Sequence, residues 1–123
     1  MNKPCILVVE DERLIARDIA MQLKALGYET LGPASTGEEA LEIAERQRPN
    51  LVLMDIHLGS GIDGVVAALA MRAQWGIPSI FMSAFDDAEQ HARAKQAEPL
   101  GYLAKPFEEY ELRNIVAAAL QER

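Results

Sequence analysis

The sequence predicts a doubly wound α/β domain, in which helices cover both faces of a parallel β-sheet. Short unbroken apolar runs such as Leu51–Met54 are bounded by turn signals, as strands buried on both faces are. These runs alternate along the chain with segments whose apolar residues recur at helical spacing, five times over. Right-handed crossovers between parallel strands then place helices on both faces of one sheet.

Composition limits the class of protein. The 123 residues suit one domain, so we expect residues 1–123 to form a single domain. Twelve basic and nineteen acidic residues give a net charge of −7, which argues against nucleic acid or an anionic membrane as the direct partner. The only cysteine, Cys5, cannot form an internal disulfide and is expected to be a small buried apolar residue. Neither a signal peptide nor a run of the ~20 apolar residues that cross a membrane is visible, so we expect a soluble cytoplasmic protein.

The N-terminal half is expected to contain two strand–helix units. Cys5–Val9 is an apolar run that ends in acidic residues, and apolar residues at helical spacing follow it. Residues 28–34 form a weaker strand, and Pro33 suits a strand at the edge of the sheet because proline cannot donate to a neighbour. Thr36 and Glu39 have the spacing of a capping box, which predicts the start of the second helix.

The C-terminal half is expected to continue the alternation. One helix, at 86–97, carries no large apolar residue, so only alanines are available to face the core. It should be the least firmly held helix of the domain, because few apolar contacts mean low local stability. The expected elements are a strand at 51–55, a helix at 65–75, a strand at 78–82, the helix at 86–97, a strand at 100–103 and a helix at 107–121.

Polar side chains follow four of the predicted strands, at the carboxyl edge where open α/β folds keep their sites. They are Glu10, Asp11, Asp55, Ser83 and Lys105. Two like charges 4 Å apart repel by roughly 4 kcal/mol at an effective dielectric of 20, so clustered carboxylates need a cation among them. Oxygen ligands without a His or Cys cluster favour a hard ion, and Mg²⁺ fits best because it needs only one or two carboxylates.

Such a cluster is suited to phosphoryl transfer. A carboxylate beside Mg²⁺, here Asp55, can act as a nucleophile toward phosphorus and form an acyl phosphate. The developing charge on the phosphoryl oxygens would be stabilised by Mg²⁺, by Lys105 and by the Ser83 hydroxyl. The sequence therefore predicts a phosphoacceptor aspartate at the end of the central strand.

Four motifs at the ends of these strands make the chain resemble the receiver domain of two-component response regulators, of the chemotaxis-regulator type. The motifs are Ile6–Asp11, Leu53–Asp55, Met82–Ala84 and Tyr102–Phe107. They occur in the order that the family has, and the resemblance spans essentially the whole chain. The expected fold is the flavodoxin-like arrangement, a five-stranded parallel sheet in the order 2-1-3-4-5.

The resemblance implies a phosphorylation site and a metal site. Asp55 would accept a phosphoryl group from a histidine kinase or a histidine phosphotransfer protein. Glu10 and Asp11 would hold Mg²⁺ together with Asp55, Asp11 more directly than Glu10. The backbone carbonyl of His57 would complete the metal site, in a loop one residue longer than the family usually has.

The resemblance also implies a switch. Ser83 would hydrogen-bond the phosphoryl group, and Lys105 would pair with it. Tyr102 matches the aromatic switch position, and Ser83 moving toward the phosphoryl group would vacate space that Tyr102 can enter. The peptide bond from Lys105 to Pro106 matches one that is cis in the family.

The signal would leave through one face of the domain. This face combines the helix at 86–97, the strand at 100–103 and the helix at 107–121, and it would bind an output partner or a second copy of the chain. Such a domain catalyses only its own phosphorylation and dephosphorylation and is not a turnover enzyme.

Two other functions would use the same fold. A phosphatase of the haloacid dehalogenase type needs a second acid two residues after its nucleophile, where His57 stands. A flavodoxin-like module that binds FMN needs a first turn rich in Ser, Thr and Gly, and this turn is acidic. The two histidines, His57 and His91, are expected to be polar surface residues.

Overall fold

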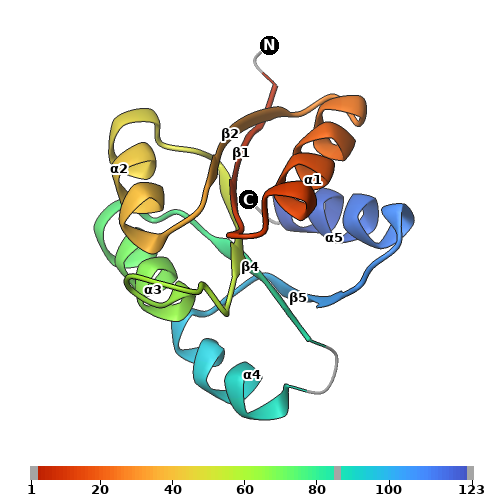
Figure 1. Ribbon diagram of the computed structural model, residues 1–123. Coiled ribbons are helices and arrows are strands. Elements are labelled where there is room, and N and C mark those ends of the chain that lie inside the picture. Colours follow the sequence, from red (N-terminus) through yellow and green to blue (C-terminus); the bar gives the residue numbers. More distant parts are fainter. Residues whose placement is uncertain (1–2, 85–86, 122–123) are drawn as a thin grey trace.

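The computed structural model, which describes residues 3–84 and 87–121, has one parallel sheet between two layers of helices (Figure 1). All neighbouring strands pair in parallel, in the order β2-β1-β3-β4-β5, which confirms the predicted flavodoxin-like arrangement. The strands are β1 (Cys5–Val9), β2 (Glu29–Ala34), β3 (Leu51–Asp55), β4 (Ser79–Ala84) and β5 (Gly101–Lys105).

The helices divide between the two faces of the sheet. Those on one face are α1 (Arg13–Ala25) and α5 (Glu109–Gln121), and those on the other are α2 (Gly37–Gln47), α3 (Gly64–Trp75) and the short α4 (Ala88–Ala94). None of the helices in the described part of the chain is long and apolar enough to cross a membrane.

Burial on both faces explains the unbroken apolar sequence of the central strands. Along β3, Val52 and Met54 contact the layer of α2 and α3, whereas Leu51 and Leu53 contact the layer of α1 and α5. All five residues of β3 are buried, including Asp55 at its end. Each large apolar side chain removed from water contributes about 1.5–3 kcal/mol, so β3 is a rigid support for that carboxylate.

The helix expected at 86–97 is shorter than predicted and is interrupted. Within the described residues α4 covers 88–94, and a 3₁₀ turn at Lys95–Ala97 follows it; residue 86 lies outside the described ranges. The segment ends at Glu98, whose left-handed backbone (φ 49°) stops the helix before Pro99. Ala94 and Ala97 are its buried side chains, as predicted, so little apolar surface anchors it.

The last strand and helix also differ from the predicted bounds. The strand expected at 100–103 is Gly101–Lys105, because pairing with β4 continues to the pair Ala84 and Lys105. The helix expected at 107–121 begins at Glu109, and the Glu108 N–H donates to the Glu111 carboxylate at 2.8 Å just before it. The strand therefore carries Lys105 to the edge of the sheet.

The capping box of α2 is shifted by one residue. Thr36 Oγ1 accepts from the Glu39 N–H at 3.1 Å, as predicted. The Glu39 carboxylate accepts from the Ser35 N–H at 2.9 Å, although we expected it to accept from Thr36. The prediction for Cys5 was also wrong, because this residue is only partly buried at the opposite edge of the sheet, where burial and the Glu29 carboxylate raise the pKa of its thiol.

Gly64 lets α3 begin directly against the end of β3. A Cβ atom at this position would lie 2.2 Å from the backbone oxygen of Asp55, a distance that no side chain tolerates. The preceding residue, Asp63, caps the helix by accepting from the N–H groups of Val65 and Val66 at 2.7 and 3.2 Å. The start of α3 thereby fixes the backbone that carries Asp55.

Candidate functional site

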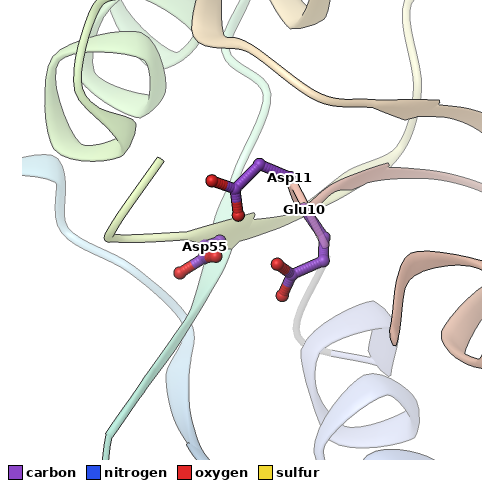
Figure 2. Close-up of side chains that lie close together, drawn as sticks. All are labelled: Glu10, Asp11 and Asp55. Carbon is purple, nitrogen blue, oxygen red and sulfur yellow. The ribbon is translucent and has the colours of Figure 1, made fainter. Parts of the chain in front are cut away.

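Three carboxylates converge at the carboxyl edge of the sheet (Figure 2). Glu10 and Asp11 follow β1, and Asp55 ends the neighbouring strand β3, so the pairing of these strands brings the three residues together. One oxygen of each carboxylate lies within 4.8 Å of the others. Glu10 and Asp55 are only 2% and 3% exposed, and Asp11 is the more accessible of the three.

Lys105 brings the ammonium group to this cluster from the end of β5. Its Nζ donates to Glu10 Oε1 at 2.6 Å and to Asp55 Oδ2 at 3.3 Å. The peptide bond from Lys105 to Pro106 is cis. One cation thus faces three acidic side chains, and the cluster retains an excess of negative charge.

That excess shows in the pKa of Asp55. This pKa is raised from its ordinary value of 3.8 to about 6, mainly by burial and then by the charge of Glu10, which Lys105 offsets only in part. Burial alone would lower the pKa of Lys105, but the hydrogen bond with Glu10 and the charge of Asp55 outweigh burial and raise it. The site therefore favours any further positive charge.

The metal-free protein should lose stability as the pH rises through the pKa of Asp55. This pKa is higher in the folded than in the unfolded chain, so the contribution is fully present below about pH 4 and is lost by about pH 7. Relative to Asp55→Asn, the parent should lose about 1–2 kcal/mol of unfolding free energy, after allowance for solvent screening. Urea unfolding of both proteins in EDTA at about pH 4.5 and pH 7.5 measures this. A parent-to-variant difference that is the same at both pH values would contradict the assignment.

The loop after Asp55 is tied to the acidic cluster. The His57 N–H donates to Asp55 Oδ1 at 3.0 Å, and the Gly59 N–H donates to Asp11 Oδ2 at 2.7 Å. Further along, the Ile62 N–H donates to both oxygens of the Glu38 carboxylate, at 3.2 and 3.1 Å. Carboxylates from two other segments thereby hold this glycine-rich loop beside the site.

Ser83 is buried at the end of β4, the strand next to Asp55, and its hydroxyl contacts a histidine. Ser83 Oγ lies 2.8 Å from Nε2 of His91, on α4. The expectation that His91 is a polar surface residue was wrong, because its ring is half-buried and stacks on Tyr102 with centroids 4.6 Å apart. The ring lies between the two residues that we expected to form the switch.

His57 is a surface residue, as expected, but it has a partner. Its Nε2 lies 2.5 Å from Asp87 Oδ2 at the start of α4, and its side chain is 58% exposed. The side chain thus joins the loop after β3 to the start of α4. No motif in the sequence indicated this pair.

The site opens into a pocket of about 770 Å³ that is lined by both charged and apolar side chains. The charged residues that line it include Asp11, Asp55 and Lys105. The apolar residues that line it include Leu14, Ile15, Ile19 and Phe107. A small charged group can reach Asp55 from solvent through this opening.

Comparison with known protein families gives one consistent result. The family model of the response regulator receiver domain matches residues 6–117. The chain is 39% identical over 102 residues to the transcriptional regulatory protein PdtaR of Mycobacterium tuberculosis. The matched residues cover 83% of this chain and 49% of PdtaR. It is 36% identical over 116 residues to the phyllosphere-induced regulator PhyR of Methylorubrum extorquens, covering 94% of this chain and 43% of PhyR. The chain therefore spans about half the length of these relatives, or slightly less.

Comparison with solved structures gives the same family. The signal receiver domain of a modulated diguanylate cyclase from Desulfovibrio desulfuricans superimposes with a TM-score of 0.91 at 40% identity, covering 98% of this chain and 96% of that one. The receiver domain of NtrX from Brucella abortus superimposes with a TM-score of 0.89 at 30% identity, covering 96% and 99%. The similarity thus extends over the whole sheet and its helices.

Proposed function

Since this chain belongs to the response regulator receiver domain family, we propose that it is a Mg²⁺-dependent phosphoacceptor that is switched by phosphorylation of Asp55. One observation carries the proposal. The Lys105 ammonium contacts both Asp55 and Glu10 at the point where three carboxylates converge. A buried nucleophile, a fixed cation and an acidic cluster in one opening are what phosphoryl transfer to a carboxylate requires.

Asp55 supplies the nucleophile. One of its carboxylate oxygens forms a bond to phosphorus while the bond from phosphorus to the donor breaks. When the donor is a phosphohistidine of a kinase or phosphotransfer protein, the broken bond is P–N and the imidazole leaves. The carboxylate must be unprotonated, and its pKa of about 6 leaves it mostly ionised at neutral pH even without a metal.

The acidic cluster fits a hard divalent cation. Glu10, Asp11 and Asp55 would hold Mg²⁺, with the backbone carbonyl of His57 as a further ligand. The donors are oxygens, and burial together with the charge of Glu10 raises the pKa of Asp55, so a cation among these carboxylates would favour its ionised form. Bound there, Mg²⁺ would offset the negative charge of the transferring phosphoryl oxygens.

Two further side chains stabilise the phosphorylated form. Lys105, already 3.3 Å from Asp55 Oδ2, pairs with a phosphoryl oxygen. The Ser83 hydroxyl donates a hydrogen bond to another phosphoryl oxygen, and Tyr102 changes its position in response. The surface of α4, β5 and α5 then binds an output partner or a second copy of the chain.

The partners follow from this chemistry. The phosphoryl donor is a histidine kinase or a histidine phosphotransfer protein, and the domain acts in the cytoplasm on no metabolite. Residues 1–123 form one receiver domain, and its net charge of −7 disfavours direct contact with nucleic acid. Its only reaction is its own phosphorylation and dephosphorylation.

Removal of Mg²⁺ should slow phosphorylation strongly. With acetyl phosphate as donor, Asp55 should gain one phosphoryl group in the presence of Mg²⁺, and the rate should fall by about 10²-fold or more in EDTA, since the phosphoryl charge then lacks its main counterion. Intact-protein mass spectrometry at neutral pH follows the reaction. Equal rates with Mg²⁺ and with EDTA would contradict the proposed metal requirement.

A further inference from the structure

His91 contacts both residues of the proposed switch from the inner side of α4. Its Nε2 lies 2.8 Å from Ser83 Oγ, and its ring stacks on Tyr102 with planes 19° from parallel. The Tyr102 hydroxyl donates to the backbone carbonyl of His91 at 3.3 Å. The position of α4 is therefore linked to Ser83 and Tyr102 through a single residue.

Which of the two residues donates in the hydrogen bond between Ser83 and His91 follows from the number of protons that a serine hydroxyl can donate. A serine hydroxyl has one proton to donate, and a buried donor is nearly always satisfied. Ser83 is 1% exposed, and within residues 3–84 and 87–121 the partner of its hydroxyl is His91. The Ser83 proton is thus directed at Nε2, which accepts it.

Phosphorylation conflicts with this arrangement. The oxygens of a phosphoryl group on Asp55 accept hydrogen bonds, so Ser83 has to donate its single proton to one of them. Nε2 of His91 then loses its donor. The contact must either break or reverse, with a protonated Nε2 donating to Ser83 Oγ.

The rest of α4 is held weakly, so this contact matters for its position. α4 buries only Ala94 among its own residues. An ion pair from Arg93 to Asp63 and a contact between Asp87 and the His57 ring tie it to neighbouring segments, and all four side chains are at least one-fifth exposed. Exposed ion pairs of this kind contribute little to stability.

We infer that His91 is a positioning residue, which accepts a hydrogen bond from the Ser83 hydroxyl in the unphosphorylated protein. When Ser83 turns to the phosphoryl group, the loss of this hydrogen bond at His91 affects the positions of α4 and Tyr102. The inference rests on the proposed phosphorylation of Asp55 and adds a residue that competes with the phosphoryl group for Ser83. His91 thereby disfavours the phosphorylated arrangement, and it couples that arrangement to the output surface.

Two substitutions separate the hydrogen bond from the ring stack. His91→Phe keeps an aromatic ring against Tyr102 but offers Ser83 no acceptor. His91→Gln keeps an acceptor of similar reach but loses the ring. Glu89→Gln, on an exposed position of the same helix, is the matched control, and thermal unfolding checks that each variant folds.

Affinity for beryllofluoride, a mimic of the phosphoryl group, in saturating Mg²⁺ is the first measurement. His91→Phe should bind about two- to tenfold more tightly than the parent, because a hydrogen bond that opposes binding is gone. His91→Gln and Glu89→Gln should bind like the parent. Parent-like binding by His91→Phe, or tighter binding by His91→Gln alone, would overturn the inference.

The imidazole of His91 gives a second, spectroscopic measurement. In the parent, the ¹⁵N chemical shift of Nε2 should change when beryllofluoride binds, because Nε2 loses the Ser83 proton. In Ser83→Ala the shift should be insensitive to beryllofluoride. A shift that stays constant in the parent, or changes equally in Ser83→Ala, would overturn the inference. If beryllofluoride did not bind the parent, the proposed function itself would fail; if it bound with no effect at His91, only the positioning role would.

Discussion

Asp55→Asn should accept no phosphoryl group under conditions that label the parent protein fully. The asparagine side chain has nearly the same shape, so the hydrogen bond from the His57 N–H can persist. Its amide oxygen is not a carboxylate nucleophile. The neutral side chain also lacks the negative charge that pairs with the Lys105 ammonium. We expect the rate of labelling to fall by at least about 10³-fold, as when a nucleophile is removed from a site that otherwise stays intact.

Phosphoramidate and Mg²⁺ with intact-protein mass spectrometry measure this effect. Asp18→Asn is a matched control, because Asp18 lies on α1, is exposed and lines the same pocket. It should be labelled at the parent rate. Labelling of Asp55→Asn at the parent rate would show that another residue is the acceptor.

Asp11→Ala should lose most of the Mg²⁺ affinity, and Glu10→Ala should lose less. The Glu10 carboxylate already accepts from the Lys105 ammonium at 2.6 Å and from the Glu12 N–H at 3.1 Å. Asp11 is more accessible, and its carboxylate accepts from the Gly59 N–H at 2.7 Å. Losing a direct carboxylate ligand should weaken binding by about 10–100-fold or more, whereas losing a partner that orients the site should cost at most about tenfold.

Isothermal titration calorimetry with Mg²⁺ compares the three proteins. Glu12→Ala removes a neighbouring acid that lines the pocket but lies outside the cluster of three carboxylates, and it should bind like the parent within about threefold. Parent-like affinity in Asp11→Ala, or a larger loss in Glu10→Ala, would contradict the proposed division of roles.

The fold could be predicted because strong, local signals agreed with one another. The runs at β1, β3 and β4 are apolar on both faces, and only a sheet covered on both sides buries such strands. Alternation with helices then restricts the topology to very few choices. The bounds at α4 and β5 were less predictable, because a left-handed residue at Glu98 and strand pairing up to Lys105 depend on tertiary contacts.

The acidic cluster could also be predicted from the sequence. Parallel strands end at one edge, so residues such as Glu10 and Asp55 that directly follow neighbouring strands must lie close together. The reach of Lys105 across the sheet edge to Glu10 is a property of a flexible side chain, and spacing alone gave only its approximate place. Side-chain roles in phosphorylation remain predictions for the experiments above.

The contact between His91 and Ser83 was missed, although a weak signal for it existed. The prediction was that only alanines of this segment could face the core, and the buried ones are Ala94 and Ala97. Extending that spacing of three by one step toward the N-terminus reaches His91, on the same face of the helix. A lone histidine in a polar segment is usually solvated, and the prediction for His91 followed that general rule.

The central claim is that Asp55 is the residue that carries the phosphoryl group, and locating the modification tests it most directly. The parent is phosphorylated with acetyl phosphate and Mg²⁺, the acyl phosphate is reduced with borohydride, and peptide mass spectrometry finds the reduced residue. Reduction should convert the side chain at position 55 to an alcohol and leave Glu10 and Asp11 unchanged. A reduced residue at any other position, with Asp55 intact, would contradict the claim.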